Sequence, residues 1–102
     1  MRTVYLVVRE PGPAWLADRP ACEQPLWLEH AAYLEGLFDR GLVLFGGPLV
    51  ETQGKRVMVL AAASRQAAFD LLARDPWTRG EVLRVASVHT WEWTLDAEAV
   101  PV

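Results

Sequence analysis

The chain has 102 residues, of which 52% are hydrophobic and five are Trp, and its formal net charge at pH 7 is −3. This length suits one domain with one core, and the Lys and Arg residues are spread among acidic residues, which argues against a nucleic-acid partner. Apolar runs are too short for a membrane helix or a signal peptide. The lone Cys22 cannot form an internal disulfide, so we expect a cytoplasmic protein.

Residues 3–9 alternate on two apolar faces and predict the first strand. Residues 10–24 predict a long connection, because Pro and Gly residues interrupt any regular element there. Trp15 is an apolar residue within this connection. Long loops in compact domains are often binding loops or lids, so Trp15 either belongs to such a lid or pins the loop to the domain.

Residues 26–39 predict an amphipathic helix with a wide apolar face, as expected for a helix that lies on a sheet. Pro25 is expected in its first turn, and Gly41 in a left-handed conformation after its end. His30 lies on the apolar face, since residues three and four positions apart share one side of a helix. This imidazole is either a half-buried side chain bonded to a backbone carbonyl or a functional group that titrates near neutral pH.

Two strands are predicted next, over residues 42–45 and 55–62. The first of them ends in Gly46, Gly47 and Pro48. Because Pro48 cannot donate a ladder hydrogen bond, this strand is expected at an edge of the sheet. The two glycines and Pro48 either let a ligand approach the strand backbone or form a bulge.

A second helix is predicted over residues 65–74, with Ser64 as its N-cap. Pro76 disfavours helix at Asp75, and an Asp before Pro is a good cap for the turn over residues 76–80. The last strand is predicted over residues 81–95, followed by a tail over residues 96–102. His89, Trp91 and Trp93 share one face of this strand and would line either a subunit interface or a pocket.

The order strand, helix, strand, strand, helix, strand predicts an α+β fold of the ferredoxin-like βαββαβ type, in one domain with its core over about residues 3–95. Its four-stranded antiparallel sheet would carry both helices on one face. Two of the predicted strands, 3–9 and 55–62, are apolar on both sides, whereas a sheet covered on one side should alternate. We therefore expect a homodimer through the sheet faces, which leaves further assembly open.

Four segments, in this order and spacing, resemble the YCII-related (YciI-like) proteins: 30–34, Gly41, 46–49 and 75–80. The resemblance covers about residues 4–93. It implies a dimeric α+β barrel whose site holds a His–Asp pair, here His30 and Asp75. The family often has Arg one turn before this histidine, where the present chain has Trp27. That departure implies a more apolar pocket or a different substrate.

In such a pair the carboxylate fixes the imidazole tautomer and makes the second ring nitrogen a better base. The leading hypothesis is therefore an enzyme that transfers a proton on a small carbonyl or aromatic-derived metabolite, as an isomerase or lactone-type enzyme does, without a cofactor. The candidate ligand-pocket residues are Tyr33, Gly47, Pro48 and Trp77. The alternatives are a non-catalytic small-ligand-binding or accessory module and a cofactor-free monooxygenase. Two histidines and one cysteine give no metal-ligand spacing, so no metal is expected.

Overall fold

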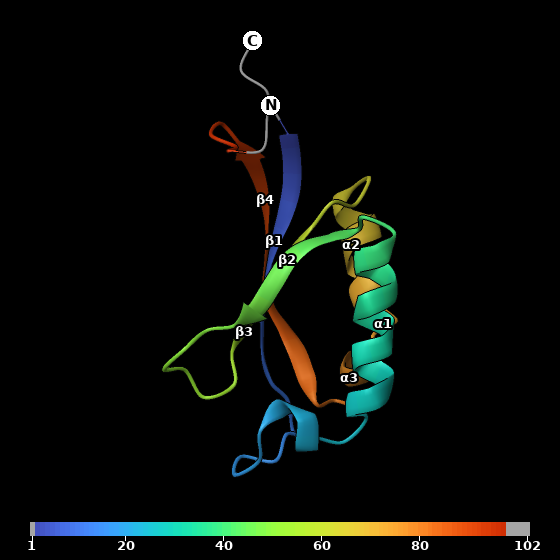
Figure 1. Cartoon of the computed structure of the whole chain (residues 1–102), viewed down its shortest axis with the longest axis vertical. Coiled ribbons are helices and arrows are strands. Elements are labelled where there is room, and N and C mark those ends of the chain that lie inside the picture. Colours follow the sequence, from blue (N-terminus) through green and yellow to red (C-terminus); the bar gives the residue numbers. More distant parts are fainter. Residues whose placement is uncertain (1, 98–102) are drawn as a thin grey trace.

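The computed structural model describes residues 2–97, and its elements follow the predicted order. Figure 1 shows the α-helices on one side of the sheet. The elements are β1 (Arg2–Pro11), the 3-10 turn η1 (Ala21–Glu23), α1 (Trp27–Asp39), β2 (Val43–Pro48), β3 (Arg56–Leu60), α2 (Arg65–Ala73), α3 (Pro76–Arg79) and β4 (Leu83–Trp93). The predicted tail lies outside the described residues from residue 98 onward.

The sheet has the strand order β2-β3-β1-β4, and every neighbouring pair is antiparallel. This arrangement confirms the predicted α+β class and the ferredoxin-like order of elements. β2 lies at an edge, as the Pro48 at its end predicts. Between residues 2 and 97, no helix is both long enough and apolar enough to cross a bilayer.

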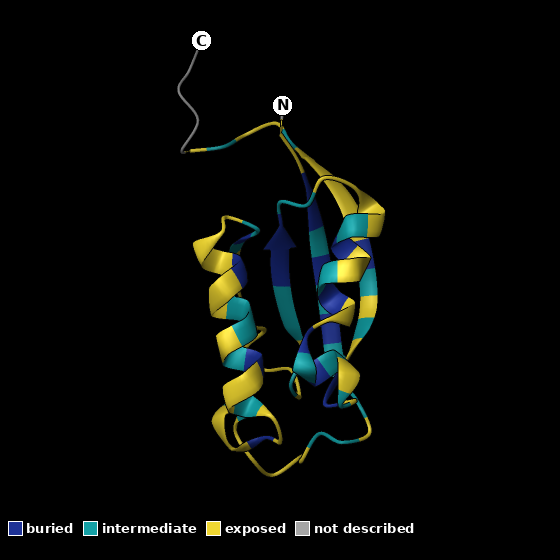
Figure 2. Cartoon of the chain, turned by 90° about the vertical axis from the view of Figure 1, so that its right-hand side faces the viewer, coloured by how far each residue is buried: buried dark blue, intermediate teal, exposed yellow. Residues whose placement is uncertain are grey.

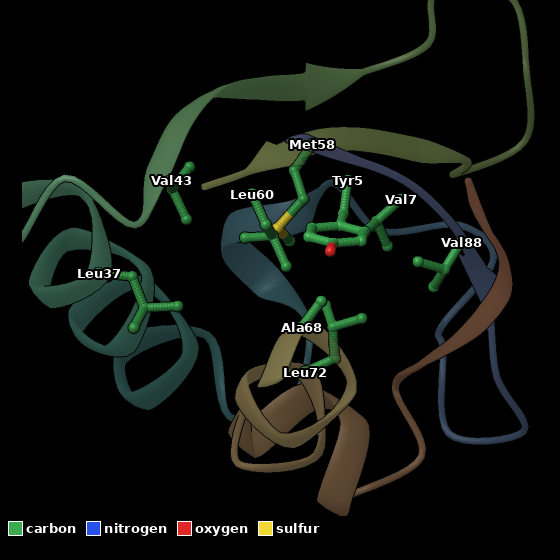
Figure 3. Packing of buried hydrophobic residues seen from close by; sticks show 9 residues of the cluster. All are labelled: Tyr5, Val7, Leu37, Val43, Met58, Leu60, Ala68, Leu72 and Val88. Carbon is green, nitrogen blue, oxygen red and sulfur yellow. The ribbon is translucent and has the colours of Figure 1, made fainter. Parts of the chain in front are cut away.

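The main core lies between the sheet and the helices (Figure 3). Tyr5 and Val7 of β1 point into it, as the alternation of that strand predicts. The other buried members of this core are Leu37, Val43, Met58, Leu60, Ala68, Leu72 and Val88. Burying each large apolar side chain contributes about 1.5–3 kcal/mol, so this layer fixes α1 and α2 on the sheet. In Figure 2 the outer surfaces of these helices are mostly exposed, whereas the central strands of the sheet, β1 and β3, are mostly buried or half-buried.

The helix ends show which of the sequence predictions for helix caps are correct. Ser64 accepts a hydrogen bond from the backbone N–H of Ala67 at 3.0 Å, and Gly41 has a φ of 73°, both as predicted. The prediction for Pro25 is wrong, because α1 begins two residues later, at Trp27. The reason is Leu26, whose φ of 61° is left-handed and breaks the helical path.

The connection between β1 and α1 is an ordered loop built around Gln24, which is 4% exposed. Its Oε1 accepts from the backbone N–H of Leu16 at 2.7 Å, and its Nε2 donates to the carbonyls of Leu16 and Arg19 at 2.8 Å each. Trp15 packs edge-on against Trp77, with 5.7 Å between the ring centroids. Trp15 therefore pins the loop to the domain, which is one of the two interpretations of the sequence.

The sheet face away from the helices carries its own apolar side chains. The register places Leu6 opposite His89 and Val4 opposite Trp91 on this face. Phe45 and Trp91 are 54% and 41% exposed. The Phe45 ring stacks on Trp93, with the centroids 5.9 Å apart. We refer to Leu6, Val8, Phe45, Val57, Trp91 and Trp93 as the open sheet face.

Candidate functional site

Asp75 lies at the junction of α2 and α3, where it is 1% exposed. Pro76 occupies the first position of α3, and Asp75 is the N-cap of that helix. Its Oδ1 accepts a hydrogen bond from the backbone N–H of Trp77 at 2.9 Å. The capping role expected from the Asp-Pro sequence is therefore present.

The same carboxylate also contacts two residues that are distant in the sequence. His30 of α1 places its Nδ1 2.8 Å from Oδ1 and 3.0 Å from Oδ2. Arg9 of β1 donates from Nη1 to Oδ2 at 2.6 Å. His30 and Arg9 are 1% and 2% exposed, so all three side chains are buried together. Since a carboxylate can accept several hydrogen bonds, Asp75 caps α3 and binds His30 at the same time.

The charge state of Asp75 fixes the tautomer of His30. Burial alone would raise the pKa of Asp75, but the hydrogen bond to His30 and the positive charge of Arg9 outweigh it, so the pKa lies below its ordinary value of 3.8. Asp75 is thus an ionised carboxylate at neutral pH and can only accept hydrogen bonds. Nδ1 of His30 must therefore carry the hydrogen, which leaves Nε2 of the neutral ring with a free lone pair.

Two tryptophans, Trp27 and Trp77, contact the imidazole, and Trp15 packs against Trp77 on the ring edge. We call Trp15, Trp27 and Trp77 the aromatic shell. Trp77 stacks on the His30 ring at 3.7 Å between centroids, with 7° between the planes. The Trp77 ring is itself fixed, because its Nε1 donates to the carbonyl of Pro25 at 2.7 Å. The shell and the Asp75 hydrogen bond together hold the imidazole in one orientation.

A cavity of about 460 Å³ lies between α1 and the edge strand β2. Arg9, the partner of Asp75, is part of its wall, so the cavity is one side chain away from the His30–Asp75 pair. The wall combines apolar residues of α1 and β2 with two arginines. Its residues include Arg9, Leu34, Phe38, Gly46, Arg56 and Met58. A volume of this size is typical of sites for small molecules.

The structure brings only some of the predicted pocket residues to this place. Gly47 lines the cavity, and Trp77 stacks on His30 without lining it. Pro48 follows Gly47 at the end of β2 and is not among the lining residues. Tyr33 packs against α2, where its hydroxyl donates to the carbonyl of Leu71 at 2.6 Å. Burial, with Asp75 nearby, raises the pKa of Tyr33.

Gly46 of β2 serves close packing rather than a bulge. The register of β2 shifts between Val43 and Phe45, so the irregularity precedes the glycines. A Cβ on Gly46 would lie 2.9 Å from both the Met58 Cβ and the Val57 carbonyl oxygen. Gly46 is therefore required for the close approach of β2 to β3, while a Cβ on Gly47 would meet no atom within 4 Å.

Sequence reasoning missed Arg9 and Arg56, which are opposite each other in the β1–β3 register and lie on the helix-facing side of the sheet. The guanidinium carbon of Arg56 is 6.0 Å from the Trp77 ring centroid. The alternation of β1 could have revealed the position of Arg9. Tyr5 and Val7 point toward the helices, and a period of two residues places Arg9 on the same side.

Other polar candidates lie apart from this site. His89 is exposed on the opposite side of the sheet, with its Nε2 3.0 Å from the Ser87 hydroxyl. Cys22 is an exposed free thiol in η1. Over residues 2–97, no group of three or more His, Cys, Asp or Glu residues could hold a metal ion.

The YCII-related domain matches residues 1–93 of the chain. A comparison with curated proteins found no match. Among solved structures, the fold is similar to that of 5-chloro-2-hydroxyhydroquinone dehydrochlorinase (TftG) from Burkholderia phenoliruptrix AC1100, solved in complex with 2,5-dihydroxybenzoquinone. The two chains are 19% identical, with a TM-score of 0.56 over 88% of this chain and 92% of that chain. This similarity shows a shared fold.

Proposed function

The chain belongs to the YCII-related domain family, and on that premise we propose that it is an enzyme in which His30 and Asp75 act as a general acid/base pair. The observation that supports this most strongly is the buried hydrogen bond of 2.8 Å between Nδ1 of His30 and Asp75. The proposed substrate is a small carbonyl or aromatic-derived metabolite, and the reaction needs no cofactor.

In the proposed reaction, Nε2 of His30 removes a proton from a carbon next to a carbonyl group. The electron pair of the broken C–H bond moves into the carbonyl and forms an enolate. In an isomerisation, the imidazolium returns the proton to another atom of the same molecule. The negative charge of Asp75 stabilises the imidazolium while it exists, which lowers the barrier to proton removal.

The solved structural relative is consistent with this class of chemistry. Its name describes a dehydrochlorinase, and its complex holds a dihydroxybenzoquinone. A reaction that removes HCl needs a group that accepts the proton, and a positioned imidazole is the commonest such group. For the present chain we propose only the same type of step, which is removal of a proton from a small oxygenated ring or carbonyl compound.

The test is proton exchange in D₂O, followed by NMR on a panel of small carbonyl acids, lactones and hydroxyquinones. We expect His30→Gln to lower the exchange rate by about 10²–10⁴-fold, the usual contribution of a positioned general base. The matched control is His89→Gln, which removes the exposed histidine on the other side of the sheet and should leave the rate unchanged. Circular dichroism confirms that both variants are folded.

An unchanged exchange rate in His30→Gln contradicts the proposal. Tight binding of one of these compounds, without turnover and unaffected by His30→Gln, supports a ligand-binding module instead. The observation that favours this second function is the burial of His30, because a side chain that is 1% exposed can serve a structural role.

We also infer that a second copy of the chain covers the open sheet face. This face leaves large aromatic side chains exposed, among them Phe45 and Trp91. Exposed apolar patches of this kind mark contact surfaces. Sedimentation at micromolar concentration should give about twice the chain mass of 11.4 kDa.

The variant Trp91→Arg should lower that mass to the mass of one chain, because it places a charge within the proposed interface. Leu28→Arg, at a residue of α1 that is 77% exposed, is the control and should remain dimeric. A wild-type protein that sediments as a monomer would overturn this inference.

A further inference from the structure

Arg56 has a positive charge that the described part of the chain does not neutralise. Arg9 directs its Nη1 to Asp75, but no ion pair joins Arg56 to any residue between 2 and 97. Arg56 is nevertheless half-buried. Burial, followed by the neighbouring charge of Arg9, lowers its pKa. The fold therefore keeps a guanidinium at a place where its surroundings disfavour the charge.

The charges near the His30–Asp75 pair leave an excess of one positive charge. Arg9 and Arg56 carry two positive charges, and Asp75 carries one negative charge. Glu35 of α1 also lines the cavity, but it is exposed and forms no ion pair with either arginine. A solvent-exposed carboxylate compensates a half-buried charge only weakly.

Arg56 is also close to the imidazole. Its guanidinium lies 6.0 Å from the Trp77 ring centroid, and the same ring stacks on His30 at 3.7 Å. Arg56 lines the 460 Å³ cavity together with Arg9. An anion bound to Arg56 would therefore be held in the cavity, one aromatic ring away from the proposed base.

We propose that Arg56 is a substrate-binding residue and that the substrate is a small organic anion, whose carboxylate or ionised hydroxyl oxygens pair with this guanidinium. The inference rests on the proposed function and specifies its substrate class. A planar guanidinium fork matches the two oxygens of a carboxylate, or two neighbouring oxygens of an ionised hydroxyquinone. In the enolate, the same positive charge would also stabilise the negative charge that develops on oxygen.

The test is direct binding, measured by calorimetry and by tryptophan fluorescence at low ionic strength. The probes are benzoate and 2,5-dihydroxybenzoquinone as anions, with benzamide as the neutral counterpart of benzoate. We expect wild-type protein to bind an anion, and Arg56→Gln to weaken that binding on the order of tenfold to a hundredfold. Arg56→Lys, which keeps the charge but not the fork, should have an intermediate effect.

Arg65→Gln is the matched control, because Arg65 also lies over an aromatic ring, at 5.5 Å from the Phe69 centroid, but is exposed on α2. Its anion affinity should equal that of the wild type. The melting temperature separates binding from a structural role: Arg56→Gln should not lower it, since it removes a disfavoured charge beside Arg9.

Three results would overturn the proposal: no anion binding by the wild type, equal binding of benzoate and benzamide, or an unchanged affinity in Arg56→Gln. Stronger binding of benzoate than of the hydroxyquinone assigns the site to carboxylates, and the reverse assigns it to ionised hydroxyls. Failure of the proposed function is distinguishable, because it appears as unchanged proton exchange in His30→Gln, whatever the affinity for anions.

Discussion

Replacing Asp75 with Asn is expected to lower the free energy of unfolding by about 3–5 kcal/mol, the usual cost of removing one partner of a buried ion pair. Asp75 accepts from Arg9, from His30 and from the backbone of Trp77. Asn can still cap α3 through its carbonyl oxygen, but it leaves the guanidinium of Arg9 buried without a counter-charge. Urea denaturation of the two proteins measures the difference.

The matched control for this substitution is Asp70→Asn on α2. Asp70 is exposed, and its carboxylate accepts a single side-chain hydrogen bond, from Gln66 at 2.9 Å. We expect this variant to stay within about 0.5 kcal/mol of the wild type, as exposed substitutions usually do. If Asp75→Asn were equally mild, the buried carboxylate would not be holding Arg9 and His30 together.

The lowered pKa of Asp75 predicts that the stability of the folded chain depends on pH. Because the pKa of Asp75 is lower in the folded chain than its ordinary value, the unfolded chain binds more protons at this residue as the pH falls. This contribution is complete above the ordinary pKa and is lost as the pH falls from about 4 through the folded pKa. The difference in stability between wild type and Asp75→Asn should therefore shrink below about pH 4. A difference that stays constant down to acidic unfolding would contradict the assigned ionisation.

The second large effect is expected for Trp77→Ala, which should cost about 3–5 kcal/mol, as for other buried aromatic residues. Trp77 is fully buried, and its ring contacts His30, Trp15 and Trp27. Loss of the indole removes this packing and the hydrogen bond to the carbonyl of Pro25. Chemical denaturation measures the cost, and the His30 ring resonances report whether the imidazole remains fixed.

Trp77→Phe separates the two parts of this effect. Phe keeps an aromatic face against His30 but cannot donate to Pro25, so a smaller loss than in Trp77→Ala is expected. A cost below about 1 kcal/mol for Trp77→Ala would show that the aromatic shell does not support the site.

The sequence was informative where the cause is local. The alternation of β1 predicted its two faces, and Ser64 predicted the start of α2. The helix predicted around His30 also exists, and His30 lies on its buried side. Each of these features depends on residues a few positions apart, which a pattern in one sequence contains.

The features that sequence reasoning missed depend on long-range contacts. Leu26 has a left-handed backbone, and its side chain reaches over Gly80, where an added Cβ would lie 2.5 Å from the Leu26 Cδ1. Arg9 is buried because Asp75, 66 residues away, compensates its charge. The hydrogen bond from the Tyr33 hydroxyl to the carbonyl of Leu71 joins α1 to α2 and depends on the same kind of long-range contact. Capping and pairing were alternatives for Asp75 in the sequence, whereas the three-dimensional arrangement lets one carboxylate do both.

The measurement that tests the central claim most directly is a two-bond ¹⁵N–¹H correlation spectrum of the His30 ring at neutral pH, assigned by comparison with His30→Gln. The account predicts a hydrogen on Nδ1, donated to Asp75, so that the neutral form of the ring has an unprotonated Nε2 that can accept a substrate proton. A neutral ring with its hydrogen on Nε2 instead would contradict the assignment of His30 as the general base.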